Sequence, residues 1–523
     1  MGGNTLKKIV GTLAMLLLPS LVAGQKAAPP SPAQVVQAVR EYRMENEDRI
    51  VRELTEFLAI PNVASDTANI QKNAAHLVEM LEARGIETHL LPITGRGPVV
   101  FGKLISAEAK RTVIFYAHYD GQPVDPAAWK CTQPFEPKIW TNGKDVCDEH
   151  VEPSKGIDEK PVARTDDWRI YARSASDDKG PIVALLDAID ALHAKRIPLA
   201  VNLKVILEGE EEAGSPNLQR TLELHRNLLG ADLLITADGP VHQSGRPLVF
   251  FGNRGDIGID LTIYGAVRAL HSGHYGNWAP NPAMELSRLL TSMKDEDGRV
   301  LIPGYYDDVT PLSEVEKKAL AEMPANDADL KRELGIAKPE GGGKKLAELI
   351  MEPSLNVRGL HSAYVGAQSQ NVVPEKAEAS LEARLVKGED PKKKFEQIAS
   401  FIEKQGFFVV DREPTLEERR VHSRIAKVIY EGGYRASRTP MDLPMSKAIA
   451  EVVRAAAGND TVLMPSSGGS VPMYIFDDLG LQWVGVPIVN YDNHQHSSDE
   501  NLRLGHFWRG MEIYGAILAD LNW

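Results

Sequence analysis

The sequence predicts an α/β protein with a mainly parallel sheet, helices on both of its faces, and a smaller inserted α+β domain. One observation is that apolar, strand-like runs such as "RTVIFYAH" and "VNLKVIL" alternate with helix-like runs such as "PIVALLDAIDALHA". This alternation is typical of parallel sheets connected by helices. The other is a change of pattern near residue 250, where "DIGIDLTI" and "AEASLEARLV" alternate apolar and polar residues, as in strands covered on one face only.

The two patterns divide the chain into segments. Residues 35–249 and 409–523 are predicted to form the two parts of the larger domain, and residues 250–408 the inserted one. The stretch 294–360, with "GGGKK" and many charges, is expected to be a loop-rich elaboration of the insert. A length of 523 residues, 43% of them hydrophobic, is ordinary for a globular protein of two or three domains.

Residues 1–24 have the features of a secretory signal peptide. Two lysines precede an apolar stretch from Ile9 to about Ala23, and small residues follow it. An uncleaved anchor is the alternative, but Pro19 and the short apolar stretch disfavour it, because a spanning helix needs about 20 apolar residues. We expect a secreted or periplasmic protein with no stable membrane insertion after cleavage, and a linker over residues 25–34.

The chain has two cysteines, Cys131 and Cys147. An oxidising compartment permits a disulfide between them, which would close a loop of about 15 residues. The segment between them contains Pro, Gly and Trp and reads as a loop, which favours the disulfide over the alternative of two free thiols. The chain has no CxxC pair and no Cys/His zinc spacing.

The charge of the chain limits its partners. A formal net charge of −13, without a cluster of Lys and Arg, argues against nucleic-acid binding, which depends on cationic contacts to phosphates. A small molecule or peptide is the expected substrate. No G-x-S-x-G motif follows a predicted strand, so nothing favours a serine hydrolase.

Acidic and histidine side chains gather where predicted strands end or a helix begins. The stretch "EGEEEAGSP" places four carboxylates within five positions directly behind a strand. In an open α/β sheet, loops at the carboxyl ends of the strands converge on one crevice. The residues at these ends are His118, Asp120, Asp177, Asp178, Glu210, Glu211, Glu212, Asp238, His494 and His496.

Such a cluster of like charges requires a cation. A run of glutamates is more often a solvated surface, and a lone HxD is usually a surface loop. Together, however, nitrogen and carboxylate ligands suit zinc, or manganese in a similar site, and one carboxylate can bridge two ions. The combined pattern therefore predicts a metal centre with two ions.

Six motifs resemble one known family. They are "YAHYDGQPV", "SASDDKGP", "EGEEEAGSP", "ITADG", "LHSGHYG" and "HSSDEN". In this order they are similar to the dinuclear-metal peptidase family of carnosine dipeptidases, acetylornithine deacetylase, succinyl-diaminopimelate desuccinylase and aminoacylase-1, and most similar to the dipeptidase branch. The resemblance implies a metal-dependent hydrolase of dipeptides or short peptides, whose inserted domain is a lid that usually forms a homodimer.

The resemblance also implies roles at the metal centre. It implies two divalent ions per chain, for which we expect Zn²⁺, with Mn²⁺ or Co²⁺ as alternatives. Glu211 would be the general base that takes a proton from a metal-bridging water, and Asp120 would orient a histidine ligand. Glu210 is interpreted as the solvated member of its run. The implied ligands are His118 and Asp238 for one ion, Glu212 and His496 for the other, and Asp177 for both.

Further positions match the family's substrate contacts. His271 matches a lid residue that stabilises the oxyanion, in dimeric relatives from the neighbouring subunit, and its alternative is a loop histidine. Arg384 matches a residue that binds the substrate carboxylate, and its alternative is a solvated strand arginine. The remaining substrate-lining positions are Asn371, Gly468, Gly469 and Ser470.

One departure from the family bears on specificity. Several dipeptidases of this branch carry Arg-Glu before the Gly-Gly-Ser turn, whereas this chain has Ser466 and Ser467. The segment 131–147 could in addition reshape the entrance to the pocket. An N-acyl-amino-acid deacylase is therefore the alternative enzyme, and a metal-free binding protein on the same fold is the alternative from another class.

Overall fold

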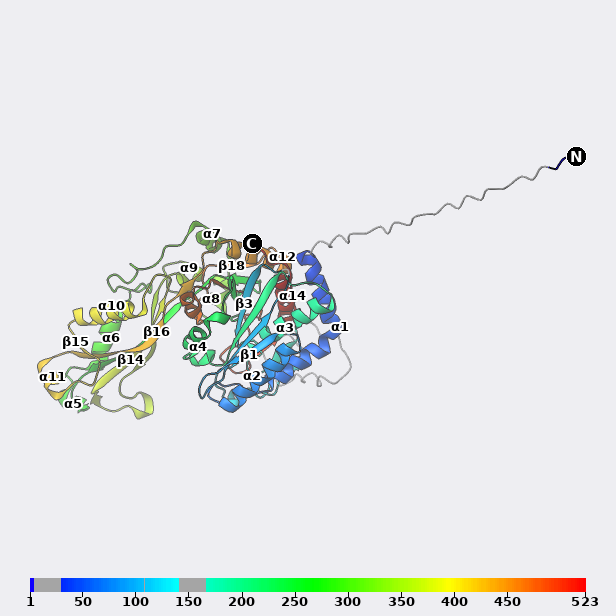
Figure 1. Ribbon diagram of the computed structural model, residues 1–523. Coiled ribbons are helices and arrows are strands. Elements are labelled where there is room, and N and C mark those ends of the chain that lie inside the picture. Colours follow the sequence, from blue (N-terminus) through cyan, green and yellow to red (C-terminus); the bar gives the residue numbers. More distant parts are fainter. Residues whose placement is uncertain (4–29, 108, 141–165) are drawn as a thin grey trace.

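The computed structural model describes residues 1–3, 30–107, 109–140 and 166–523. It consists of a larger domain and an elongated lid beside it (Figure 1). Nearly all of the predicted signal peptide lies outside the described residues, as does Cys147. Among the helices of the described segments, none is long and apolar enough to cross a membrane. The first helix, α1 (Pro32–Leu58), begins inside the predicted linker, so the linker is shorter than expected.

The larger domain is built on an eight-stranded sheet. Its central strands β6, β3, β7 and β19 are parallel, whereas β1 and β2 at one edge are antiparallel, and so is the pairing of β19 with β8. The prediction of a mainly parallel sheet is therefore confirmed. In spatial order the strands are β1 (Glu87–Leu91), β2 (Val99–Leu104), β6 (Val201–Glu208), β3 (Arg111–His118), β7 (Leu233–Thr236), β19 (Trp483–Gly485), β8 (Leu248–Phe250) and β18 (Val462–Met464).

Both faces of this sheet are covered. Successive side chains of a strand point to opposite sides, so one strand contributes to an apolar core on each face. Val113 and Phe115 of β3 join one apolar core, and Ile114 and Tyr116 join the other. Helices packed around the first core are α1, α2 (Thr67–Glu82), α3 (Lys179–Ala194), α12 (Pro444–Ala457) and α14 (Leu504–Asp520). Around the second lie α4 (Leu218–Leu224) and α13 (Met473–Asp478).

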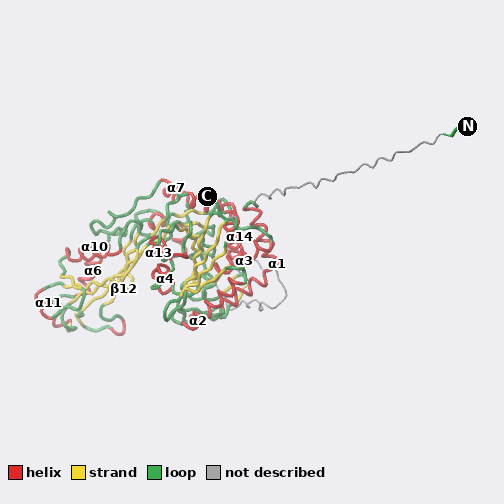
Figure 2. Tube along the Cα trace, viewed as in Figure 1, coloured by secondary structure: helices red, strands yellow, loops and turns green. Residues whose placement is uncertain are grey.

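The lid contains a five-stranded sheet with helices on one face (Figure 2). Helices α6 (Pro282–Met293) and α10 (Pro391–Lys404) bury the alternating apolar residues of its strands. The sheet continues past the predicted boundary at residue 408, because the later strand β16 pairs with β10. In spatial order the strands are β12 (Ser354–His361), β14 (Lys376–Leu385), β10 (Gly255–Tyr264), β16 (Ile425–Tyr434) and β15 (Phe408–Val410).

The elaboration of the lid contains helices where loop was expected. These are α7 (Glu314–Glu322), α8 (Asp327–Glu333) and α9 (Leu346–Ile350). Leu320 and Met323 belong to the second apolar core of the larger domain, and α7 packs against β18 at the edge of its sheet. A buried ion pair, 2.9 Å from Arg438 Nε to Glu316 Oε1, fixes α7 there. The elaboration therefore connects the lid to the larger domain.

Small elements complete the fold. Strand β9 (Gly252–Asn253) pairs with β17 (Ser437–Arg438) where the chain passes between the domains. Strands β4 (Lys138–Trp140), β5 (Arg169–Tyr171) and β20 (Asn501–Arg503) form a three-stranded sheet. In the lid, β11 (Leu270–His271) pairs with β13 (Val372–Val373), and short helices α5 (Ser272–Tyr275) and α11 (Leu416–Val421) lie at the end of the lid away from the larger domain (Figure 1).

Candidate active site

Three neighbouring parallel strands deliver acidic and histidine side chains to one edge of the sheet. Strand β3 ends at His118, and the flanking strands β6 and β7 lead into the turn Glu211–Ala213 and to Asp238. Loops at the carboxyl ends of parallel strands meet in one crevice. Asp177, just before α3, and His496, in the loop before β20, join them from elsewhere in the chain.

The five predicted ligands form two groups that share Asp177. His118, Asp177 and Asp238 offer ligand atoms within 4.8 Å of one another, and so do Asp177, Glu212 and His496. Asp177 Oδ1 lies 2.8 Å from His118 Nε2, and its Oδ2 lies 3.1 Å from His496 Nε2. Each oxygen of one carboxylate thus faces a different group, as a carboxylate between two ions must.

The electrostatics of this cluster favour added positive charge. Burial raises the pKa of Asp238 to about 6 and that of Glu212 to about 7, and the charge of Asp177 adds to both increases. The hydrogen bond to Asp177 raises the pKa of His496 to about 9. Asp238, Glu212 and His496 thus hold protons more tightly than usual in a buried space crowded with carboxylates. The pKa of Asp177 is instead lowered, because its hydrogen bonds with His118 and His496 outweigh the effect of burial. Dications would supply the missing charge, and the nitrogen and oxygen donors fit zinc or manganese.

Asp120 is placed to hold two parts of the site at once. His118 Nδ1 lies 3.1 Å from the backbone carbonyl of Asp120 and 3.4 Å from its carboxylate Oδ1, so Asp120 is within reach of the predicted orienting role. Its two oxygens also accept hydrogen bonds from the backbone N–H groups of Glu211 and Glu212, at 3.1 and 3.0 Å. The carboxylate therefore positions the glutamate turn as well as the histidine.

Glu211 and Glu212 differ in their surroundings although they are adjacent. Glu212 Oε2 lies 3.4 Å from His496 Nε2 and accepts a 2.6 Å hydrogen bond from Gln122. Burial raises the pKa of Glu211 well above its usual value, and the charges of Asp238 and Glu212 reinforce the increase. A carboxyl group with such a raised pKa is suited to accept and return a proton.

The interpretation of Glu210 as a solvated residue is wrong. Glu210 is only 1% exposed, accepts a 2.9 Å hydrogen bond from Asn217 and lies 3.4 Å from Arg96 Nε. Glu210 belongs to neither metal group, and its contacts support the turn after β6. Glu208, at the end of β6, is also buried and accepts a 2.6 Å hydrogen bond from the Tyr116 hydroxyl.

Glu500 is a residue of the site that sequence reasoning missed. Its buried carboxylate accepts hydrogen bonds from the backbone N–H groups of Ser174, Ser176 and Asp177, at 2.9 to 3.0 Å, and pairs with Arg173 at 2.8 Å. It therefore ties the Asp177 loop to the loop that carries His496. The only signal was its place in the quoted motif "HSSDEN".

The predicted substrate residues Arg384 and Ser470 lie together. Arg384 Nη1 donates a 2.7 Å hydrogen bond to Ser470 Oγ, and Ser470 Oγ donates to the carbonyl of Arg254 at 2.9 Å. Gly468 and Gly469 belong to the same turn, which follows β18. Arg384, on the lid, is thus held against the larger domain rather than being a solvated strand residue.

His271 and Asn371 lie together in the lid but apart from the metal groups. Both are exposed, and the carbonyl of Asn371 accepts a 2.9 Å hydrogen bond from Ser272 N. His271 directly precedes α5, at the end of the lid away from β3 (Figure 1). Within one chain the described residues do not bring His271 to the cluster.

The cysteine loop borders the His496 loop. Backbone N–H groups of Lys130 and Cys131 donate to Asp499 Oδ1 at 2.9 and 2.8 Å. Cys131 is buried and disulfide-bonded. Cys147 lies outside the described residues, so the pairing of these two cysteines stays a prediction.

A third acidic group has its own cations. Glu53, Asp187 and Asp190 lie close enough to bind an ion, but Arg84 contacts Glu53 at 2.9 Å and Asp190 at 2.7 Å, and Arg49 contacts Asp187 at 2.5 Å. Two guanidinium groups therefore balance two of the three negative charges of this group, which joins α1 to α3.

A match to a protein-family model identifies the family of this chain. Residues 145–520, more than half of the chain, match the model described as peptidase family M20/M25/M40. The chain belongs to this family. It is therefore a metallopeptidase, as the resemblance implied.

Individual relatives of this M20 chain are peptidases as well. It is 25% identical to the human Beta-Ala-His dipeptidase, over 99% of this chain and 98% of that one. It is 27% identical to the Cys-Gly metallodipeptidase DUG1 of Candida albicans, over 90% of this chain and 94% of that one. A solved M20 family metallo-carboxypeptidase from Sulfolobus solfataricus is 30% identical, with a TM-score of 0.73 over 90% of this chain and 98% of that one.

Proposed function

We propose that this protein is a dinuclear metal-dependent dipeptidase. The observation that carries the proposal is the sharing of Asp177 between two ligand groups at the end of the parallel sheet. His118 and Asp238 would complete one ion site, and Glu212 and His496 the other. The names of the dipeptidase relatives support the substrate class.

The residues around the cluster support one hydrolytic mechanism. The ions, when bound, would polarise the scissile carbonyl and make water more acidic. Glu211 accepts the proton from the attacking water and returns it to the leaving amine. Asp120 holds Glu211 and Glu212 in place through their backbone N–H groups, so that neighbouring carboxylates keep separate tasks.

Arg384 supports a substrate that carries a free carboxylate. Its guanidinium is held beside Ser470 but is also close to acids, with Glu382 Oε1 at 2.8 Å and Asp256 Oδ1 at 3.8 Å. A substrate carboxylate has to compete with these acids. Because Ser466 and Ser467 stand where an Arg-Glu pair is expected, a second charged contact is missing, and the N-acyl-amino-acid deacylase stays the second candidate.

A substrate screen separates the two candidates. We expect the zinc- or manganese-loaded protein to hydrolyse unblocked dipeptides faster than the matching N-acetyl amino acids, with products identified by mass spectrometry. Amidation of the dipeptide's carboxyl end should slow hydrolysis, because Arg384 then loses its anionic partner. Faster release of acetate than of amino acids would instead assign the protein as a deacylase.

We further propose that the protein is a homodimer in which His271 serves the neighbouring subunit's site. In support, His271 is exposed and lies away from its own metal groups. Mixing His271→Ala with Asp177→Ala subunits, each inactive alone, should restore about a quarter of the activity, because half of randomly formed C₂ dimers then hold one complete site. Verified heterodimers without any activity would exclude His271 from a shared site.

We also propose export to the periplasm or the exterior, on the basis of the apolar stretch that begins at Ile9. The disulfide-bonded state of Cys131 is compatible with an oxidising compartment. The amino-terminal residue of the isolated protein checks this proposal, because cleavage near Gly24 removes the preceding residues. An intact amino terminus in a cytoplasmic fraction would contradict it.

A further inference from the structure

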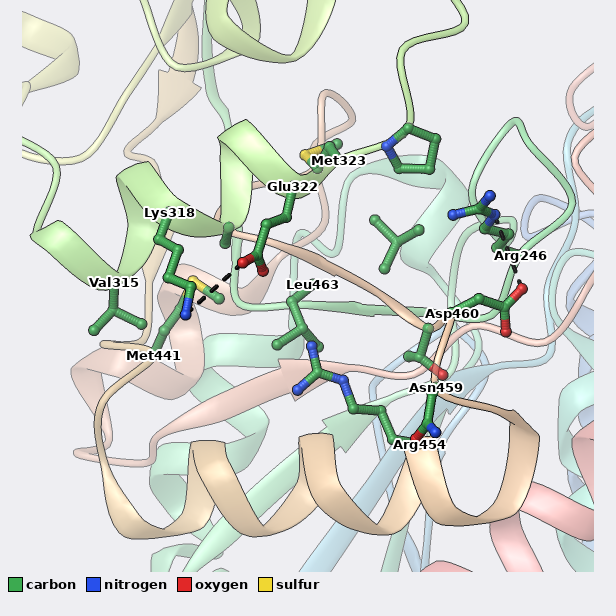
Figure 3. A pocket seen from close by; sticks show the side chains of 14 residues that line it. Arg246, Val315, Lys318, Glu322, Met323, Met441, Arg454, Asn459, Asp460 and Leu463 are labelled. Carbon is green, nitrogen blue, oxygen red and sulfur yellow. Dashed lines mark ion pairs between the residues drawn. The ribbon is translucent and has the colours of Figure 1, made fainter.

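A cavity of about 280 Å³ lies where the elaboration of the lid meets the larger domain. One wall is α7 with the residues that follow it to Pro324, and the other is formed by α12, β18 and the turn between them. Figure 3 shows side chains from both walls directed into this space. None of the lining residues belongs to the metal groups or to the Arg384–Ser470 contact.

The rim of the cavity carries loosely paired charges. Lys318 Nζ lies 3.8 Å from Glu322 Oε1, and Arg246 Nε lies 3.9 Å from Asp460 Oδ2, as the dashed lines in Figure 3 mark. All four side chains are exposed to solvent. Long, exposed ion pairs contribute little to stability, so these charges are free to turn toward a ligand.

Arg454 is a cation of the cavity wall that has no carboxylate partner among the described residues. It extends from α12 toward Leu463 in Figure 3, and its Nε is buried without a hydrogen-bond partner. Among the described residues, no carboxylate forms an ion pair with Arg454. A planar guanidinium with open donors is the preferred partner of a carboxylate.

The floor of the cavity is apolar. Ala319 and Met323 of the lid's elaboration face Met441 and Val462 of the larger domain, and all four are at least 90% buried. Methionine side chains adapt to ligands of different shapes. A ligand that fits both parts therefore has an apolar body and an anionic end.

We propose that this cavity binds a small organic carboxylate with an apolar body, its carboxylate on Arg454. The class includes aliphatic acids and free amino acids with apolar side chains. For an amino acid, Glu322 and Asp460 at the rim are available to the ammonium group.

A ligand in the cavity would affect the turn that holds the predicted substrate residues, because two strands connect the cavity to that turn. Strand β18, in the cavity wall, leads directly into the turn that holds Gly468, Gly469 and Ser470. Its partner β8 follows Arg246 and leads to Arg254, whose carbonyl accepts the hydrogen bond from Ser470. Because the lid supplies the other wall, a bound ligand would also fix the lid relative to this turn. The cavity is thus placed to regulate substrate binding from outside the active site.

Binding to the full-length, metal-loaded protein tests the proposal. We expect L-leucine and isocaproate to bind saturably in calorimetry and to raise the Tm, whereas leucinamide, which lacks the carboxylate, should not. Arg454→Gln should weaken binding at least about tenfold. Tighter binding of leucine identifies an amino acid as the occupant, and tighter binding of isocaproate identifies a simple acid.

Matched variants locate the binding. Arg420→Gln, an exposed arginine on α11, should bind like the wild type, and so should Arg384→Gln, which removes the proposed substrate contact in the active site. Arg454→Lys, which keeps the charge, should bind more tightly than Arg454→Gln. Equal binding in Arg454→Gln, loss of binding in Arg384→Gln, or no saturable binding of any probe would overturn the proposal. These results do not depend on hydrolysis, so they stand apart from the proposed dipeptidase activity.

Discussion

Glu211→Gln is expected to lower the turnover of dipeptides by about 10² to 10⁴, which corresponds to about 3 to 5 kcal/mol of transition-state stabilisation. The amide keeps the size and hydrogen bonding of the side chain but cannot accept a proton from water. The backbone N–H of residue 211 still reaches Asp120, so the turn should keep its shape. Metal content and KM should therefore stay close to the wild-type values while kcat falls.

Two matched variants interpret this result. Glu212→Gln removes a carboxylate that faces His496, so it should first lose one metal ion, and added zinc or manganese should partly restore activity. Glu223→Gln, on the exposed side of α4, should change neither metal content nor turnover. If Glu211→Gln loses metal and Glu212→Gln retains it, the two roles are exchanged.

Asp177→Asn is expected to remove both metal ions and to abolish hydrolysis. Each of its oxygens faces a different ligand group, so one substitution weakens both sites at once. Removal of the ions from the wild type by a chelator should have the same effect on hydrolysis, and added zinc or manganese should reverse it only in the wild type. Metal analysis of the purified proteins should give about two ions per chain for the wild type and close to none for the variant.

The control is Asp260→Asn, an exposed aspartate on the lid sheet that should leave both ions in place. Circular dichroism checks that Asp177→Asn is folded. A folded Asp177→Asn protein that keeps both ions and its activity would contradict the shared role of Asp177.

The metal centre could be predicted because each ligand follows an element with a clear pattern. The apolar runs of β3, β6 and β7 locate the strand ends, and parallel strands bring those ends together. The clustering of these ligands at one edge of the sheet follows from this one rule. His496 lies in the long loop between β19, a strand of the same parallel set, and β20, so the strand end alone does not place it and the motif was needed as well.

Other features depend on contacts that the pattern along the chain does not contain. The run "IAKVIYEGGY" falls within residues 409–523, which the sequence predicts for the larger domain, but its pairing with β10 places it in the lid. Glu210, Glu211 and Glu212 are chemically alike, and only the geometry of the turn decides which one is buried. Likewise, nothing local shows that Glu500 turns inward to bind backbone groups of a distant loop.

The hydrogen bond from Asp177 N to Glu500 joins residues 323 positions apart, with the whole lid between them. Closing such a large loop costs conformational entropy, and contacts of this sequence separation form slowly. A chain that is still being synthesised carries Asp177 long before Glu500 and His496 exist. Until both halves of the larger domain have joined, its carboxylates lack the geometry that selects an ion. We therefore expect an amino-terminal fragment that ends before His496 and Glu500 to bind metal more weakly than the completed chain.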